Sequence, residues 1–182
     1  MPWVVALGFG TLLDQLTKHW AELHVRPRGI VTLVPDLLDL RYVRNPGAFF
    51  SLGAELQSDV RRVLLSGASI LVLVLIVGAY RRAHAEAARV RWGLAFMGAG
   101  AIGNLIDRVR SGEVVDFVHL HYGPVLRWAT FNLADVAITL GLCLLAWDML
   151  RPGAAAGADA QRSTDGMPVA ADRHERRHLN HV

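Results

Sequence analysis

Four long apolar blocks constrain this chain more than any other feature of its sequence. Of its 182 residues, 53% are hydrophobic, and they are concentrated rather than scattered at the period of a soluble helix or strand. The blocks are residues 3–20, 63–79, 90–106 and 128–150. About 20 helical residues span the hydrocarbon core of a bilayer, which is roughly 30 Å thick. The pattern predicts an integral membrane protein with four transmembrane helices, although charged residues and glycines interrupt the first and third blocks.

The positions of the five tryptophans support this prediction. Tryptophan is enriched where a membrane helix crosses from hydrocarbon to water, because its ring is apolar and its N–H needs a partner. All five stand at or near the end of a block: Trp3, Trp20, Trp92, Trp128 and Trp147. A soluble core would give them no reason to avoid the block centres.

The charges of the connecting segments predict an orientation. The connection 81–91 holds four arginines and one glutamate, and short loops rich in arginine face the cytoplasm. Both termini then lie in the cytoplasm as well, although arginines in the first outer segment oppose this bias. The outer side receives residues 21–61 and 108–127, whose VTLVP, LLDLRYVRN and EVVDFVHLHYG runs predict strands that pair into a small sheet.

The expected fold class is therefore a membrane all-α protein with a small β element outside the membrane. Residues 1–151 form its transmembrane domain. Residues 152–182 are rich in Ala, Gly, Asp and Arg without apolar periodicity, which predicts a disordered cytoplasmic tail.

Several classes of function are disfavoured by composition. The net charge of +3 is mild and no basic stripe with interleaved aromatics is present, so no nucleic-acid partner is expected. Cys143 is the only cysteine, which excludes a disulfide within the chain. The tail carries HERRH at 174–178, the pattern of zinc proteases. Zinc chemistry needs a packed helix and a third ligand, so we expect neither a metal nor a cofactor.

Polar residues within the apolar blocks are the candidate functional residues. Asp14 and Lys18 are four residues apart and share one helix face, so they can form an ion pair that is merely structural. In the third block, Asn104, Asp107 and Arg108 form one polar face. Asp107 and Arg108 can be a simple interfacial pair, whereas Asn104 is harder to dismiss. The glycines of this block would let a neighbouring helix approach closely.

Asp135 is the most costly residue of the fourth block. A carboxylate at the centre of a membrane helix costs on the order of 2.5–3.5 kcal/mol. Counted from Trp128 along a continuous helix, Asp135 lies about 10 Å deep, beyond the reach of its short side chain to water. Asn132 precedes it by three residues and shares its face. Asp135 therefore needs a polar partner or a water-filled cavity.

Asp116 is the candidate partner for Asp135. On a regular strand it would share a face with Val114, Val118 and Leu120. An acid on such an apolar face is unexpected unless it has a function. Two adjacent carboxylates cannot both ionise readily, so one becomes an acid and the other a base. The residues alone leave three functions open: a metal-independent aspartic peptidase, a proton or ion relay in a transporter, and a purely structural set of polar contacts.

Five sequence motifs resemble the conserved blocks of lipoprotein signal peptidase, also called signal peptidase II. In order they are DQLTK (14–18), RNPGAFFS (44–51), GNLIDR (103–108), VVDF (114–117) and FNLADVAI (131–138). Phe49 and Ala129 depart from the usual pattern of the family, which has a small residue and often a proline at these positions. Neither change touches the candidate acids, so they bear on substrate fit and not on the class of enzyme.

The resemblance implies a bacterial inner-membrane aspartic endopeptidase with its active site toward the outer face. Such an enzyme cleaves prolipoproteins just before a diacylglyceryl-modified cysteine, in contact with membrane lipids, and we expect a monomer. Asp116 and Asp135 match the catalytic pair. The positions that match the residues supporting the site are Asp14, Lys18, Asn45, Gly47, Asn104, Arg108 and Asn132.

Overall fold

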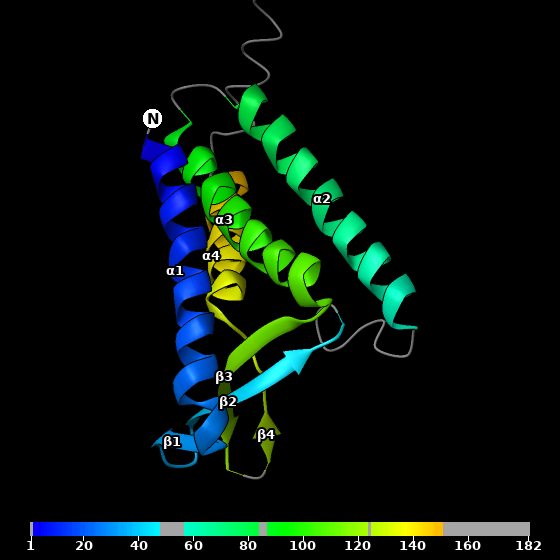
Figure 1. Cartoon of the computed structure of the whole chain (residues 1–182). Helices are drawn as coiled ribbons and strands as arrows, with labels where there is room; N and C mark the ends of the chain where they lie inside the picture. The colour runs from blue at the N-terminus through cyan, green and yellow to red at the C-terminus, as the bar shows by residue number, and fades with distance from the viewer. Residues whose placement is uncertain (1, 48–56, 84–86, 124, 151–182) are drawn as a thin grey trace, which may run out of the picture. The chain divides into compact units, whose positions relative to one another are not determined.

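The computed structural model describes residues 2–47, 57–83, 87–123 and 125–150. They form four long helices and a small antiparallel sheet (Figure 1). The elements in order are α1 (Pro2–His24), the short helix η1 (Arg26–Arg28), β1 (Ile30–Val34), β2 (Leu38–Asn45), α2 (Ser58–Arg82), α3 (Ala88–Ser111), β3 (Val114–Tyr122), β4 (Leu126–Arg127) and α4 (Leu133–Met149). One compact unit, Met1–Trp147, contains all of them except the last two residues of α4. A mostly helical fold with a small β element is thereby confirmed.

Helix α3 is the centre of the helical part. Both α1 and α2 pack against it, and α4 lies beside it (Figure 1). The contact with α4 depends on glycine, as the sequence predicted. A methyl group added at Gly100 would overlap the carbonyl oxygen of Ala134, and one added at Gly141 would overlap the carbonyl oxygen of Gly93. Backbones this close leave no room for a side chain between them.

The three predicted strand regions all form strands of one sheet. Its order is β1-β2-β3-β4, with every neighbouring pair antiparallel. The face of β3 is less regular than simple alternation predicts. The N–H groups of Phe117 and Val118 both donate to the carbonyl oxygen of Phe131, and Phe117 is buried beside Asp116. Phe117 packs on Ala21 near the end of α1, which ties the sheet to the helices.

The fourth apolar block is not one continuous helix. It follows β4 with an irregular segment in which Phe131 pairs with Val118, and α4 begins only at Leu133. The depth of about 10 Å expected for Asp135 assumed a helix that began near Trp128, and this assumption is wrong. Asp135 lies in the first turn of α4. The backbone pairing of Phe131 with β3 takes precedence over helix formation there.

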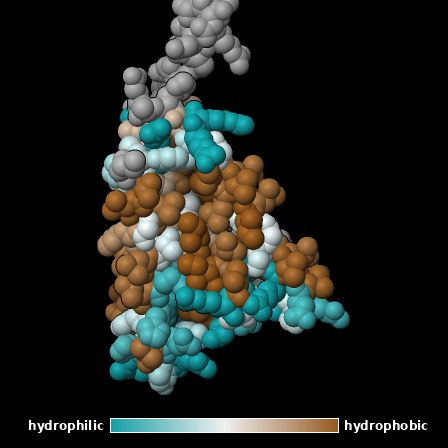
Figure 2. All heavy atoms as spheres, turned by 45° about the horizontal axis from the view of Figure 1, so that its top comes forward, coloured by the Kyte–Doolittle hydropathy of each residue, from teal (hydrophilic) through white to brown (hydrophobic). Residues whose placement is uncertain are grey.

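Apolar side chains cover much of the outside of the helices. Among the described helices, α2 alone is recognised as a membrane span by length and composition. The α4 helix has 17 residues, and α1 and α3 contain charged residues. Phe9 in α1, Val63 in α2 and Leu140 in α4 are all more than half exposed. Figure 2 shows apolar residues gathered between polar regions on either side. Such an apolar surface needs an apolar environment or a partner to cover it.

The close contact of α3 with α4 predicts that Gly100→Ala destabilises the protein. The new methyl group would force α4 away from α3, and comparable overpacking costs about 1–3 kcal/mol. Gly67→Ala in α2 is the matched control, because nothing lies within 4 Å of the position of its methyl group. Thermal unfolding in detergent should show a lower Tm for Gly100→Ala and an unchanged or higher Tm for Gly67→Ala. A Gly100→Ala protein as stable as the wild type would contradict this packing.

Candidate active site

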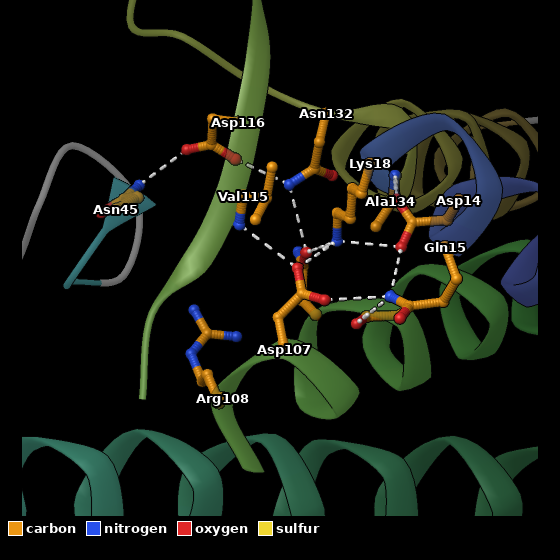
Figure 3. A network of polar contacts seen from close by, with 12 residues as sticks. Asp14, Gln15, Lys18, Asn45, Asp107, Arg108, Val115, Asp116, Asn132 and Ala134 are labelled. Atoms are coloured by element: carbon orange, nitrogen blue, oxygen red, sulfur yellow. Dashed lines mark hydrogen bonds and ion pairs between the residues drawn. The ribbon is translucent and has the colours of Figure 1, made fainter. Parts of the chain in front are cut away.

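A buried polar cluster lies where α1, α3 and the start of α4 meet strand β3 (Figure 3). Buried polar groups need partners, because an unpaired one costs free energy. The cluster contains six buried polar residues, which are Asp14, Lys18, Asn104, Asp107, Asp116 and Asn132. Every one of them has a polar partner within the cluster.

Asp135 and Asn132 cap the start of α4 reciprocally. The N–H of Asp135 donates to Oδ1 of Asn132 (3.0 Å), and the N–H of Asn132 donates to Oδ2 of Asp135 (3.1 Å). Such a capping box satisfies two N–H groups that a helix start otherwise leaves unpaired. The local sequence thus fixes both the first turn of α4 and the orientation of the Asp135 carboxylate.

Asp116 is 2% exposed and accepts two hydrogen bonds from amide side chains. Nδ2 of Asn45 donates to its Oδ2 (3.0 Å), and Nδ2 of Asn132 donates to its Oδ1 (2.7 Å). Burial, with the negative charge of Asp135, raises the pKa of Asp116 to about 6, although both hydrogen bonds favour the ionised form. Asn132 therefore donates to the carboxylate of Asp116 from its side chain and to the carboxylate of Asp135 from its backbone N–H.

Asn104 connects the two aspartates with α1. Its Nδ2 donates to Oδ1 of Asp135 (3.0 Å). Its Oδ1 accepts from Nζ of Lys18 (2.9 Å) and from Nδ2 of Asn132 (3.2 Å). The amide of Asn104 thus receives a charge-assisted hydrogen bond on one side and donates to Asp135 on the other.

Lys18 pairs with Asp14, as the four-residue spacing predicted, at 2.9 Å. It also pairs with Asp107 at 2.8 Å. The sequence left open that Asp107 pairs with Arg108. The structure instead pairs the carboxylate of Asp107 with Lys18. Gln15, which the sequence reading did not single out, donates from Nε2 to Oδ1 of Asp107 (3.0 Å). The available signal was its position beside Asp14 in the DQLTK motif.

Arg108, Gly47 and Asn45 form the edge of the cluster nearest β2. The N–H of Gly47 donates to Oδ1 of Asn45 (3.0 Å), and Nη2 of Arg108 donates to the carbonyl oxygen of Gly47 (3.4 Å). Through Asn45 these residues reach Asp116. All nine residues predicted for the site therefore belong to one connected network.

Three features of the sequence bear less directly on the described site. Phe49 and the HERRH stretch at 174–178 lie outside the described residues, whereas Ala129 lies in the irregular segment before α4. Within the described ranges, no group of three His, Cys, Asp or Glu side chains is arranged to hold a metal ion.

Comparison with known proteins points to one family. The sequence profile described as Signal peptidase (SPase) II matches residues 6–151. The lipoprotein signal peptidase of Moorella thermoacetica is 36% identical over 159 residues, covering 87% of this chain and 99% of its own. That of Azoarcus sp. is 39% identical over 153 residues, covering 84% and 85%.

Two solved structures described as bacterial membrane enzymes have a similar fold. One has a TM-score of 0.70 and 26% identity, covering 82% of this chain and 93% of its own. The other has a TM-score of 0.69 over 91% and 92% of the two chains, and its 23% identity makes it a likeness of fold alone.

The raised pKa of Asp116 predicts a pH-dependent effect of Asp116→Asn on stability. The folded protein favours the protonated acid, so this contribution is fully present below pH 3.8 and lost as the pH rises through about 6. The Tm of the variant minus that of the wild type should therefore increase between pH 4 and pH 7.5. Asp59→Asn, at an exposed carboxylate of α2, controls for the loss of an acidic residue. A Tm difference that stays constant or falls over this range would contradict the burial of the Asp116 charge.

Proposed function

The chain belongs to the signal peptidase II family, the membrane enzymes that cleave signal peptides from prolipoproteins, and from this premise we propose that Asp116 and Asp135 are its catalytic pair. The observation that carries the proposal is the placement of both carboxylates around one amide residue, Asn132. The remaining oxygen of Asp135 accepts from Asn104. Buried amide donors hold each acid in a fixed orientation, which a catalytic pair requires.

The two aspartates can hydrolyse a peptide bond with a water molecule as the nucleophile. The ionised aspartate takes a proton from a water molecule, whose oxygen attacks the scissile carbonyl carbon. The protonated aspartate donates a hydrogen bond to the carbonyl oxygen and stabilises the charge that develops there. The C–N bond then breaks as the peptide nitrogen takes up a proton from the pair. The pKa of Asp116, raised to about 6, supports an acid–base role of this residue near neutral pH.

The substrate class includes a lipid. We propose that the chain cleaves before a diacylglyceryl-modified cysteine, as the family resemblance implies. The candidate site lies at the end of the helices that meets the sheet (Figure 1). An acyl-anchored substrate stays in the bilayer, so its peptidase must bring acids and water to the edge of the membrane. This position of the site supports the assignment.

Four transmembrane helices, with both termini in the cytoplasm, are the topology that we propose. The exposed apolar side chains on α1, α2 and α4 support it. Arg81 and Arg82 end α2 and Arg89 and Arg91 begin α3, at the end remote from the sheet (Figure 1). By the positive-inside rule this end faces the cytoplasm, and the sheet and the candidate site face outward. The protein would then work as a monomer in the bacterial inner membrane, with residues 152–182 as a cytoplasmic tail outside the 1–151 peptidase domain.

The catalytic assignment predicts that Asp116→Asn and Asp135→Asn each abolish cleavage while the protein still folds and inserts. Asparagine keeps the shape of the side chain but cannot carry the proton, and general acid–base catalysis contributes about 10²–10⁴-fold. Purified variants are incubated with a diacylated prolipoprotein, and the product is followed by its shift on a gel.

The control for this experiment is Asp59→Asn, which removes an exposed carboxylate in the first turn of α2, outside the polar cluster. It should cleave at the wild-type rate. Turnover by Asp116→Asn or Asp135→Asn within a few-fold of wild type would rule out the aspartic mechanism.

A further inference from the structure

The residue before each proposed catalytic aspartate is held by a buried carboxylate from another element. On β3, the N–H of Val115 donates to Oδ2 of Asp107 in α3 (3.2 Å). On α4, the N–H of Ala134 donates to Oδ1 of Asp14 in α1 (2.9 Å). Figure 3 shows Val115 next to Asp107 and Ala134 next to Asp14, with the ammonium group of Lys18 between the two carboxylates. The backbone leading into Asp116 and the backbone leading into Asp135 are thus anchored in the same way.

Lys18 joins the two anchors. Its Nζ lies 2.9 Å from Oδ2 of Asp14 and 2.8 Å from Oδ2 of Asp107. The third donor of the ammonium goes to Asn104, so all three of its N–H groups have partners. Lys18, Asp14 and Asp107 are at most 8% exposed. Away from water an ion pair is screened little, so its geometry resists displacement.

The local sequence explains why Asp107 can reach β3. Gly112 caps the C-terminal end of helix α3, and its φ of 79° is left-handed and suits glycine. This turn reverses the chain, so that Val115 lies beside Asp107, eight residues earlier. On the other side, Asp14 lies against Gly103, where an added methyl group would overlap its carboxylate. Both anchors therefore depend on a glycine of α3 or of its C-terminal turn.

We propose that Asp14, Lys18 and Asp107 form a clamp that sets the separation of Asp116 and Asp135, and that Asp107 is the positioning residue for Asp116. This inference rests on the proposed catalytic pair. The clamp acts on the backbone of β3 and of α4 and touches neither catalytic carboxylate. Its purpose is alignment, since a misplacement of about 1 Å can cost a hundredfold in rate.

Asp107→Asn tests the clamp. Asparagine carries no charge for Lys18, and its N–H₂ group takes the place of the oxygen that accepts from Gln15, so two donors face each other. The side chain is then held less firmly, and its remaining oxygen fixes the N–H of Val115 less well. We expect kcat to fall by about ten- to a hundredfold, with KM for a diacylated prolipoprotein within about threefold, because the variant leaves the outer surface intact.

The pH–rate profile separates positioning from a purely structural role. Two close carboxylates titrate in well-separated steps, which set the two limbs of a bell-shaped profile. If loss of the Asp107 charge were the only effect, both limbs of the profile would shift along the pH axis in the same direction. Loosening the pair would bring the limbs closer together, because repulsion between the acids decreases with distance. The clamp predicts this narrowing.

Asp107→Glu is the second variant, in case Asp107→Asn does not fold. It keeps the charge for Lys18 but lengthens the link to Val115 by one methylene group, and should reduce kcat with a smaller loss of Tm. Asp59→Asn is the control for a lost carboxylate, at an exposed position.

Two results have distinct meanings. Wild-type kcat and limb separation in Asp107→Asn, or in a folded Asp107→Glu, would overturn the clamp and leave the catalytic pair intact. Cleavage by Asp116→Asn would instead overturn the pair itself.

Discussion

The ammonium group of Lys18 is buried where α1 and α3 meet, and it must find partners there for three N–H groups. Removing an ammonium ion from water costs several kcal/mol unless carboxylates and hydrogen bonds compensate for it. Asp14 from the preceding turn of α1 supplies one partner, and Asp107 and Asn104 of α3 supply the others. The two helices can satisfy this cation only in one relative position, which Gly103 permits by leaving room for Asp14.

The same carboxylates extend this constraint to the rest of the site. Asp14 holds the start of α4, and Asp107 holds β3. Asn132 then caps α4 and donates to Asp116, so one residue fixes both the start of α4 and the position of the Asp116 carboxylate. Buried amides and one cation orient the two acids in this site.

Much of this arrangement could be predicted from the residues. The four-residue spacing predicted the Asp14–Lys18 pair, and the cost of acids in apolar sequence singled out Asp116 and Asp135. The strands followed from alternating and β-branched runs, and close helix packing followed from the glycines of the third block. These signals are local, or depend on the free energy of burying a single group, so one sequence suffices.

Features that depend on tertiary contacts could not be predicted. The start of α4 at Leu133 depends on the backbone pairing of Phe131 with β3, which hydropathy does not show. The same pairing disturbs the alternation of β3 at Phe117. The partner of Asp107 depends on how α1 meets α3, and the neighbouring Arg108 is a closer candidate in sequence. The spacing of residues along a helix shows which of them share a face. It does not show which other helix packs against that face.

We propose that Asp116 and Asp135 work as one catalytic unit, and the residual rate of the double variant Asp116→Asn/Asp135→Asn is the sharpest test of this. Groups that act as a unit have non-additive effects, since removing either already removes the function of both. The double variant should therefore cleave a diacylated prolipoprotein at the same residual rate as each single variant. A double variant slower by the product of the two single losses would show that the acids act independently, and would contradict the account.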